Sequence, residues 1–240
     1  MQKCSGRNNG DYMKKYSVLS YSLIVSSLFL PVLSLISYCI GYRVSLLNYS
    51  VFSTISALFY IVSTAVILKN NIVNKALVFL PIFSLINLAV YVYKSKSVVV
   101  LICMCICSIC SAVIAEKVCN SSKAKISSVL TSVVLSVPFL IVSLAVVSFA
   151  KFGVNTVVDK IYSPDKTYYA EIVDIDQGAL GGNTVVNIHK NSRLDLLFMT
   201  IAKAPQRAYV GEWGEYETMK LQWKSEQCLI IDSKEYIVEI

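Results

Sequence analysis

Hydrophobic and polar positions divide the chain into two unlike parts. Residues 1–150 contain long uncharged apolar stretches, whereas residues 151–240 contain short segments in which apolar and polar positions alternate. A helix needs about 20 consecutive apolar residues to cross the roughly 30 Å hydrocarbon core of a bilayer. The first part therefore predicts five membrane-spanning helices, at 16–40, 46–68, 76–93, 98–115 and 126–150.

The second part predicts a small β domain. Its apolar segments are short, rich in β-branched and aromatic residues, and separated by turn residues, which is typical of strands. We place strands at 168–175, 184–190, 195–202, 207–210, 217–223, 228–231 and 235–240. So many strands in about 80 residues fit a meander sheet or a small sandwich.

The predicted fold class is an α-helical transmembrane bundle of about five spans followed by a small all-β antiparallel domain. Residues 1–15 are expected to form a basic cytoplasmic tail and residues 16–150 the transmembrane domain. Residues 151–160 are expected to form a stem, and residues 161–240 the β domain.

Charge supports the same division. The chain is 55% hydrophobic and only 15% charged, whereas soluble domains carry about 25% charged residues. Residues 1–150 hold 12 Lys or Arg and two acids, Asp11 and Glu116, whereas residues 151–240 hold ten Lys or Arg and 13 acids. Because the β domain is thus slightly acidic, nothing in it predicts nucleic-acid binding.

The distribution of Lys and Arg predicts an orientation, since short cytoplasmic loops carry an excess of these residues. With the N-terminus inside, the inner segments carry Lys3, Arg7, Lys14, Lys15, Lys69, Lys75, Lys117, Lys123 and Lys125. The outer segments carry Arg43, Lys94, Lys96 and Lys151. Five spans then place the β domain outside the cytoplasm of a cell-membrane protein.

The predicted spans contain no Asp, Glu, Lys, Arg or His. Ion-coupled transporters keep such residues in their spans for function, so their absence argues against a proton relay or a path for charged substrates. Serines recur instead, at Ser20, Ser27 and Ser34 and again at Ser136 and Ser143. We favour helix packing over a channel lining for these serines, because small polar residues let helices approach closely.

Four cysteines, Cys103, Cys105, Cys107 and Cys110, cluster in the fourth span. Four thiolates suit zinc, but structural zinc sites normally fold a loop around the metal. We therefore interpret these cysteines as small apolar side chains and expect neither a metal nor another cofactor.

A resemblance adds to this interpretation. Its pattern consists of three segments in chain order: Tyr162-Ser163-Pro164-Asp165-Lys166-Thr167-Tyr168, then Asp176-Gln177-Gly178-Ala179, and finally Trp223 with Leu229-Ile230-Ile231. This pattern resembles a poorly characterised family of membrane-anchored Gram-positive bacterial proteins. The resemblance implies an anchored domain of unknown function and supplies no catalytic residues.

Candidate chemistry in the β domain is sparse. Asp174 and Asp176 before Gly178 are similar to the start of a calcium loop, but the later ligand positions are missing. His189 is the only histidine, and we interpret it as a solvated residue on a strand face. With one possible histidine base and no nucleophile motif, the sequence predicts no enzyme.

The most unusual surface feature is the segment from Gly211 to Glu217, where acids alternate with aromatic residues. A Trp that only covers the sheet is one interpretation of it. The other is a contact surface for a carbohydrate or a basic peptide, formed by Glu212, Trp213, Glu215 and Tyr216, because aromatic residues are enriched at interface hot spots.

Two functions follow from these observations. The first is a membrane protein that presents its β domain outside the membrane to bind, sense or protect, with the lipid bilayer and an unidentified protein or envelope component as partners. The alternative is a carrier or channel for neutral or lipidic substrates, with the β domain as an accessory.

Overall fold

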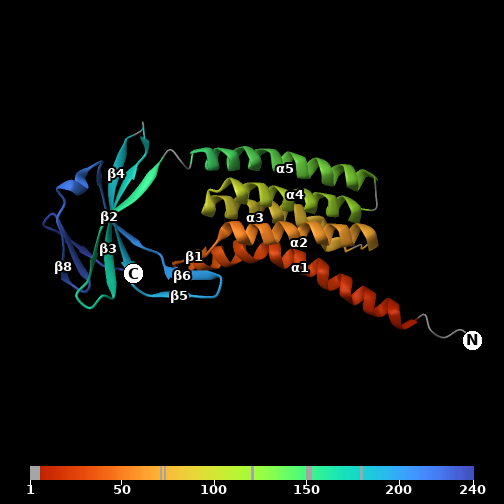
Figure 1. The fold of residues 1–240 in the computed structure, drawn as a ribbon, viewed down its shortest axis with the longest axis horizontal. Helices are drawn as coiled ribbons and strands as arrows, with labels where there is room; N and C mark the ends of the chain where they lie inside the picture. Colours follow the sequence, from red (N-terminus) through yellow and green to blue (C-terminus); the bar gives the residue numbers. More distant parts are fainter. Residues whose placement is uncertain (1–5, 71, 73, 120–121, 150–152, 179–180) are drawn as a thin grey trace, which may run out of the picture. The chain divides into compact units, whose positions relative to one another are not determined.

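The structure is a computed structural model that describes residues 6–70, 72, 74–119, 122–149, 153–178 and 181–240. Its first part is helical (Figure 1). The helices are α1 (Gly6–Cys39), α2 (Tyr49–Asn70), the 3-10 helix η1 (Lys75–Phe79), α3 (Leu80–Ser95), α4 (Val98–Val118) and α5 (Ser122–Phe149). Residues 6–15, predicted as a tail, therefore belong to helix α1.

Four helical segments of the described chain are long and apolar enough to cross a membrane, namely Ser17–Cys39, Tyr49–Asn70, Lys75–Ser95 and Val98–Val118. In α5 the described apolar segment is Ser136–Phe149, within a helix of 28 residues. The prediction of an apolar helical bundle before a β domain is confirmed.

Helix α4 packs against both α2 and α3. Buried hydroxyls join helices to one another: Ser84 of α3 and Ser111 of α4 lie 2.8 Å apart, oxygen to oxygen, and Ser27 of α1 hydrogen-bonds the Tyr60 hydroxyl of α2. Between α2 and α3, the Asn74 side chain accepts from the Ala76 N–H and begins η1. Pro81 then lies in the first turn of α3, where its missing N–H costs no helical hydrogen bond.

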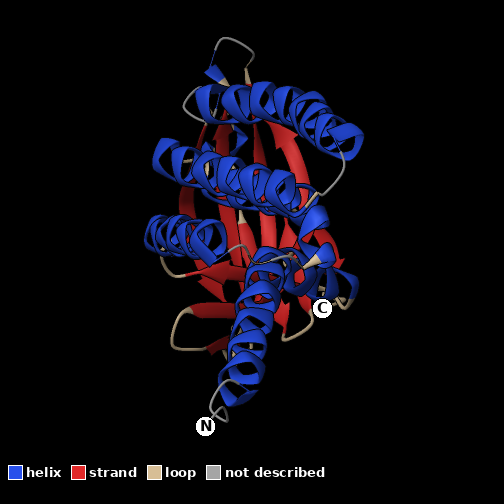
Figure 2. Ribbon diagram, turned by 90° about the vertical axis from the view of Figure 1, so that its right-hand side faces the viewer, coloured by secondary structure: helices blue, strands red, loops and turns tan. Residues whose placement is uncertain are grey.

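The second part forms three sheets in which every pair of strands is antiparallel. Figure 2 shows the strands in red. Its strands are β2 (Val154–Tyr162), β3 (Tyr168–Asp176), β4 (Gly182–Lys190), β5 (Arg193–Asp195), β6 (Met199–Lys203), β7 (Gln206–Glu212), β8 (Leu221–Ser225), β9 (Cys228–Ile231) and β10 (Lys234–Ile237). A 3-10 turn, η3 (Glu215–Glu217), follows β7. The sheet orders are β2-β3-β4-β7, β10-β9-β8 and β1-β6-β5.

Two of these sheets enclose the core of the β domain. The core consists of four residues of the four-stranded sheet and two of strand β9, namely Ala170, Ile172, Val186, Ile188, Leu229 and Ile231. Alternate residues of β3 and β4 thus face inward, as the period of a strand requires. The indole N–H of Trp223 donates to the Ile161 carbonyl over 3.2 Å and links β8 to β2. The sandwich alternative of the sequence prediction is the one observed.

Strand β1 (Tyr42–Leu46) comes from the loop between α1 and α2. It pairs with β6, with Leu46 opposite Met199 and Tyr42 opposite Lys203. Residues 34–47 accordingly group with the β domain, an association of segments far apart in the chain that the sequence prediction did not include.

Three predicted boundaries differ from the structure. Residues 154–160 of the expected stem form most of strand β2, which pairs along its length with β3. The expected strand 195–202 is instead a hairpin of β5 and β6. The expected strand 217–223 begins in η3, and its strand β8 starts only at Leu221.

Candidate functional site

The segment Gly211–Glu217 forms a tight turn at the end of β7. Gly214 has a φ of +80°, a left-handed conformation that glycine adopts at no steric cost. The Trp213 ring lies against the backbone of Gly182, where a Cβ would come within 2.6 Å of the ring carbon Cδ1. Trp213 is nevertheless 56% exposed, so the ring rests on the sheet and remains open to solvent.

The Glu215 carboxylate holds this turn together. One oxygen accepts from the Tyr209 hydroxyl at 2.7 Å, and the other accepts from the Glu212 backbone N–H at 2.9 Å. This arrangement needs glycine at 211, since a Cβ there would lie 1.7 Å from a Glu215 oxygen. The hydrogen bond to Glu215 raises the pKa of Tyr209 to about 12, because the carboxylate accepts from the protonated hydroxyl.

The structure divides the predicted contact residues into two groups. Tyr216 packs against the core of the sandwich, and Glu215 is engaged within the turn. Glu212 and Trp213 are exposed, as is the neighbouring Glu217. The surface available to a partner is therefore an aromatic ring flanked by carboxylates.

A second cluster lies on the face of the four-stranded sheet that is turned away from the sandwich core. Tyr169 stacks on His189 at 4.8 Å between ring centroids and 3° between planes. The Lys160 ammonium lies 3.6 Å from the Tyr169 centroid and 3.7 Å from a Glu171 oxygen. The other Glu171 oxygen lies 3.3 Å from Nε2 of His189.

His189 is thus half-buried rather than solvated, which corrects the sequence interpretation. Its Nε2 is enclosed, and the Glu171 oxygen 3.3 Å away lies within ion-pair distance but makes no hydrogen bond with it. Burial lowers the pKa of His189, and Lys160 and Arg43 lower it further, whereas Glu171 raises it. The sequence placed His189 on the correct strand face, but only the register that sets it opposite Tyr169 explains the burial.

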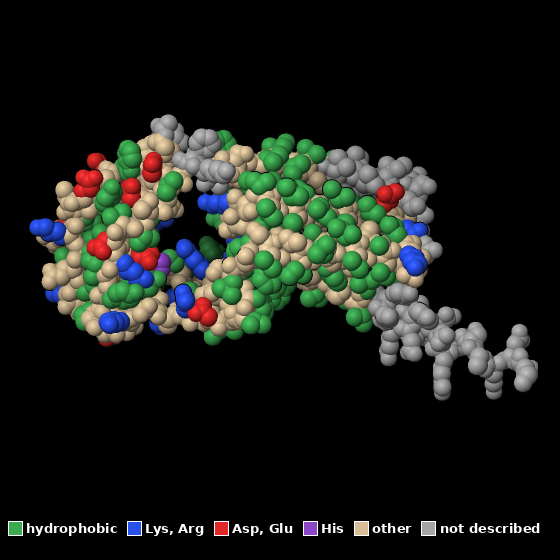
Figure 3. Space-filling view, in the orientation of Figure 1, with side chains coloured by type: hydrophobic (Ala, Val, Ile, Leu, Met, Phe, Trp, Pro, Cys, Tyr) green, Lys and Arg blue, Asp and Glu red, His purple; other side chains and the backbone are tan. Residues whose placement is uncertain are grey.

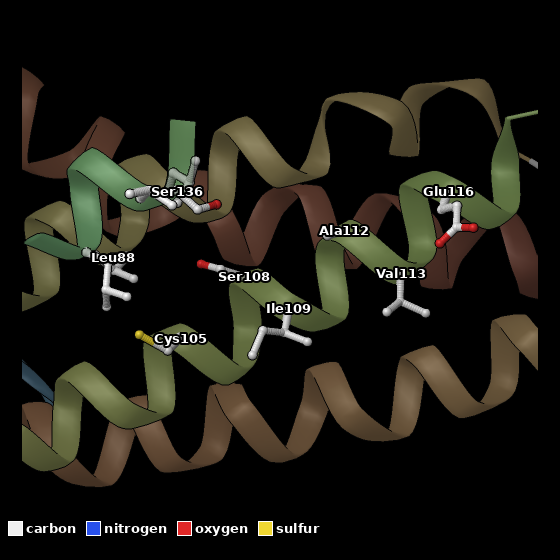
Figure 4. A pocket seen from close by; sticks show the side chains of 11 residues that line it. Leu88, Cys105, Ser108, Ile109, Ala112, Val113, Glu116 and Ser136 are labelled. Carbon is white, nitrogen blue, oxygen red and sulfur yellow. The ribbon is translucent and has the colours of Figure 1, made fainter. Parts of the chain in front are cut away.

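The helical part contains a cavity of about 410 Å³ lined by α3, α4 and α5. Cys105, Ser108, Ala112 and Glu116 follow one another along one face of α4 (Figure 4). The remaining lining residues are Leu85, Leu88, Ile109, Val113, Ser136, Val137 and Leu140. Most of this lining is aliphatic, so the cavity suits an apolar occupant.

The four cysteines of α4 do not form a recognisable metal site. Cys107 is buried, and Cys103, Cys105 and Cys110 are partly exposed. Within the described residues, no group of three His, Cys, Asp or Glu side chains lies close enough to hold a metal ion.

The acidic end of β3 closes a turn. An Asp176 carboxylate oxygen accepts from the Gly178 N–H at 2.7 Å, and one oxygen of Asp174 is buried without a hydrogen-bond partner. The Asp176 contact is that of an Asx turn.

Comparison with known proteins adds no relative: no family model, no curated protein and no solved structure matches this chain.

Proposed function

We propose that this chain is a multi-pass membrane protein whose β domain lies outside the cytoplasm and acts by binding rather than by catalysis. The observation that carries the proposal is the Trp213 turn. Its ring is held against the sheet and left 56% exposed, and Trp is enriched among the residues that dominate binding at protein interfaces.

The pairing of β1 with β6 supports the topology. The loop that contains β1 joins α1 to α2, so the sheet β1-β6-β5 lies on the side of the membrane where α1 ends. The chain must therefore cross the membrane an even number of times between Leu46 and Val154. Crossing by α2, α3, α4 and α5 meets this condition, whereas three crossings would separate the paired strands.

A reporter fused after Ile240 tests the orientation. We expect activity from a reporter that works only outside the cytoplasm, because Lys and Arg favour an inner N-terminus. Activity from a reporter restricted to the cytoplasm would contradict the proposed side. A second fusion in the loop between α1 and α2, after Ser45, must report the same side as the fusion after Ile240.

The Trp213 turn suits two kinds of ligand. The exposed ring offers a flat apolar face for a sugar, and the carboxylates of Glu212 and Glu217 can accept hydrogen bonds from its hydroxyls. The same carboxylates would attract the cations of a basic peptide, with the ring as a cation–π partner.

Fluorescence titration of the full chain in lipid nanodiscs tests this surface. The probes are N-acetylglucosamine oligosaccharides and a Lys-rich peptide, and we expect one of them to change the Trp213 emission. Trp213→Phe should remove the change, whereas Trp223→Phe, at the other tryptophan, should retain it. No response to either probe, or a response that survives Trp213→Phe, would contradict the contact surface.

The cavity between α3, α4 and α5 favours a second candidate function, a carrier for neutral or lipidic molecules. Its volume of about 410 Å³ lies within the size range of small-molecule sites. Ala112→Trp should fill the cavity, whereas Ile141→Trp changes an outward side chain that is 62% exposed. In proteoliposomes, transbilayer movement of a fluorescent phosphatidylcholine should be slowed by Ala112→Trp alone. Equal rates in protein-free vesicles would contradict this function.

A further inference from the structure

The β5–β6 hairpin has an unusual tip. Asp195 pairs with Thr200, and the Leu196 N–H donates to the Met199 carbonyl at 2.8 Å, so Leu197 and Phe198 form the turn itself. Leu197 is 95% exposed, and Leu196 and Phe198 are exposed beside it. Turns on a protein surface normally consist of Gly, Pro, Asn, Asp and Ser, so this tip presents apolar side chains where polar ones are expected.

The β9–β10 hairpin of the same domain provides the contrast. Its turn is also two residues long, Asp232 and Ser233, between the paired residues Ile231 and Lys234. Both turn residues have positive φ, +45° and +72°, as in a type I′ hairpin turn. The turn Asp232–Ser233 therefore has the polar residues expected of a turn exposed to water, whereas the turn Leu197–Phe198 has apolar ones.

The apolar tip is tied to the membrane part of the chain. Leu47 donates its backbone N–H to the Phe198 carbonyl at 3.1 Å, and Leu47 is itself 66% exposed. Helix α2 begins at Tyr49, two residues later, and two residues span at most about 7 Å. The 22 residues of α2 extend about 33 Å, little more than the roughly 30 Å hydrocarbon core.

These lengths set the depth of the tip. The headgroup layer on each side of the hydrocarbon core is about 5–7 Å thick. Leu47 lies within about 7 Å of Tyr49, the first residue of α2, and therefore in that layer or at its boundary, and Phe198 is hydrogen-bonded to Leu47. The same small sheet carries Arg43, which is exposed, and Lys203, whose ammonium lies 5.1 Å from the Tyr42 ring centroid. Cations and aromatic rings at this level are typical of membrane interfaces.

We propose that the tip Leu196–Phe198 inserts into the lipid bilayer beside the start of α2 and anchors the sheet β1-β6-β5 to the membrane surface. The partner is the boundary between headgroups and acyl chains, which takes apolar side chains and retains the charged ones in the headgroup layer. This inference requires that α2 spans the membrane. It depends neither on the side of the β domain nor on the Trp213 surface.

Photo-crosslinking of the full chain in lipid nanodiscs tests the insertion. Leu197→benzoylphenylalanine places the photoreactive group at the tip, and Ser233→benzoylphenylalanine places it at the matched polar turn. We expect a mass increase of one phospholipid on the Leu197 variant after illumination and none on the Ser233 variant. No lipid adduct at 197, or equal adducts at both turns, would overturn the proposal.

A second variant separates insertion from mere proximity to lipid. With benzoylphenylalanine at 197, Leu196→Asp adds a charge that resists entry into the apolar layer, and Leu196 is 41% exposed, so the hairpin can accept the change. We expect the lipid adduct to be lost while trypsin resistance of the β domain is retained. An undiminished adduct would show that the tip only lies near the surface, which also overturns insertion.

Discussion

The two parts of this protein differ in the side chains on their surfaces and in the polar side chains that they bury. On the helical part the visible surface is largely hydrophobic, whereas on the β domain Lys, Arg, Asp and Glu appear on the surface (Figure 3). Inside the helical part lie serines such as Ser27 and Ser111, both fully buried. Inside the β domain lie Ile172, Val186 and Leu229.

The difference shows what drives folding in each part. In water, burying apolar surface stabilises the fold at about 25 cal/mol per Å². In lipid, that driving force between helices is absent, and close packing with hydrogen bonds between helices replaces it. The contact between Ser84 and Ser111 and the core of the sandwich therefore do similar structural work by different means.

The largest expected change in stability comes from replacing an isoleucine by alanine, once in the β domain and once in the helical part. Ile188→Ala leaves a cavity at a fully buried core position and should lower the free energy of unfolding of the β domain by about 2–5 kcal/mol. Both tryptophans of the chain, Trp213 and Trp223, lie in this domain, so urea unfolding can be followed by their fluorescence. Ile141→Ala, at an outward position of α5, should leave helix stability in detergent unchanged, and equal losses at both sites would refute the contrast.

A smaller effect is expected at Lys166, which has a φ of +62° in the turn before β3. A side chain in this left-handed region costs roughly 1–2 kcal/mol. Glycine would avoid that cost, but it loses more conformational entropy on folding, which cancels part of the gain. Lys166→Gly should therefore stabilise the β domain by up to about 1 kcal/mol, measured by the same urea titration. Lys166→Ala retains the Cβ and is the control; a gain from alanine as large as that from glycine would contradict the conformational explanation.

The Ser84–Ser111 contact should contribute less. Hydrogen bonds between transmembrane helices average about 0.6 kcal/mol in double-mutant cycles. The cycle of Ser84→Ala, Ser111→Ala and the double variant, followed by helical circular dichroism during denaturation in SDS, should give a coupling energy near that value. A coupling energy of zero would mean that each hydroxyl is satisfied within its own helix, as the bond from Ser84 to the Pro81 carbonyl at 2.9 Å allows.

The smallest expected effect is a pH dependence of the free energy of unfolding of the β domain. The pKa of His189 is lowered from its ordinary value of 6.5, chiefly by burial, so the unfolded chain takes up a proton at higher pH than the folded one. Stability present above about pH 6.5 should therefore be lost as the pH falls through the folded pKa. Urea titrations between pH 7.5 and pH 5 measure the free energy of unfolding at each pH. His189→Gln should remove the part of its pH dependence that is due to His189. The same pH dependence in the variant would assign the effect to other groups.

Much of the fold was predictable because each signal is local. A run of apolar residues about as long as a bilayer is thick identifies a span whatever surrounds it, and the period of two identifies strands such as β3 and β4. The hairpin at Leu196–Phe198 was missed for a related reason. Its turn lacks Gly, Pro, Asn, Asp and Ser, so no turn residue interrupts the apparent strand 195–202.

The helical part, the β domain and the division between them could be identified from the amino-acid sequence alone, since they depend on the local pattern of apolar residues. Three features came from the packed fold instead: β1 joins β6, His189 stacks on Tyr169, and Tyr216 packs against the core whereas Trp213 is exposed. The physical reason is that pairing and register bring distant residues together, and periodicity assigns a residue to a face without specifying its neighbours across the strands.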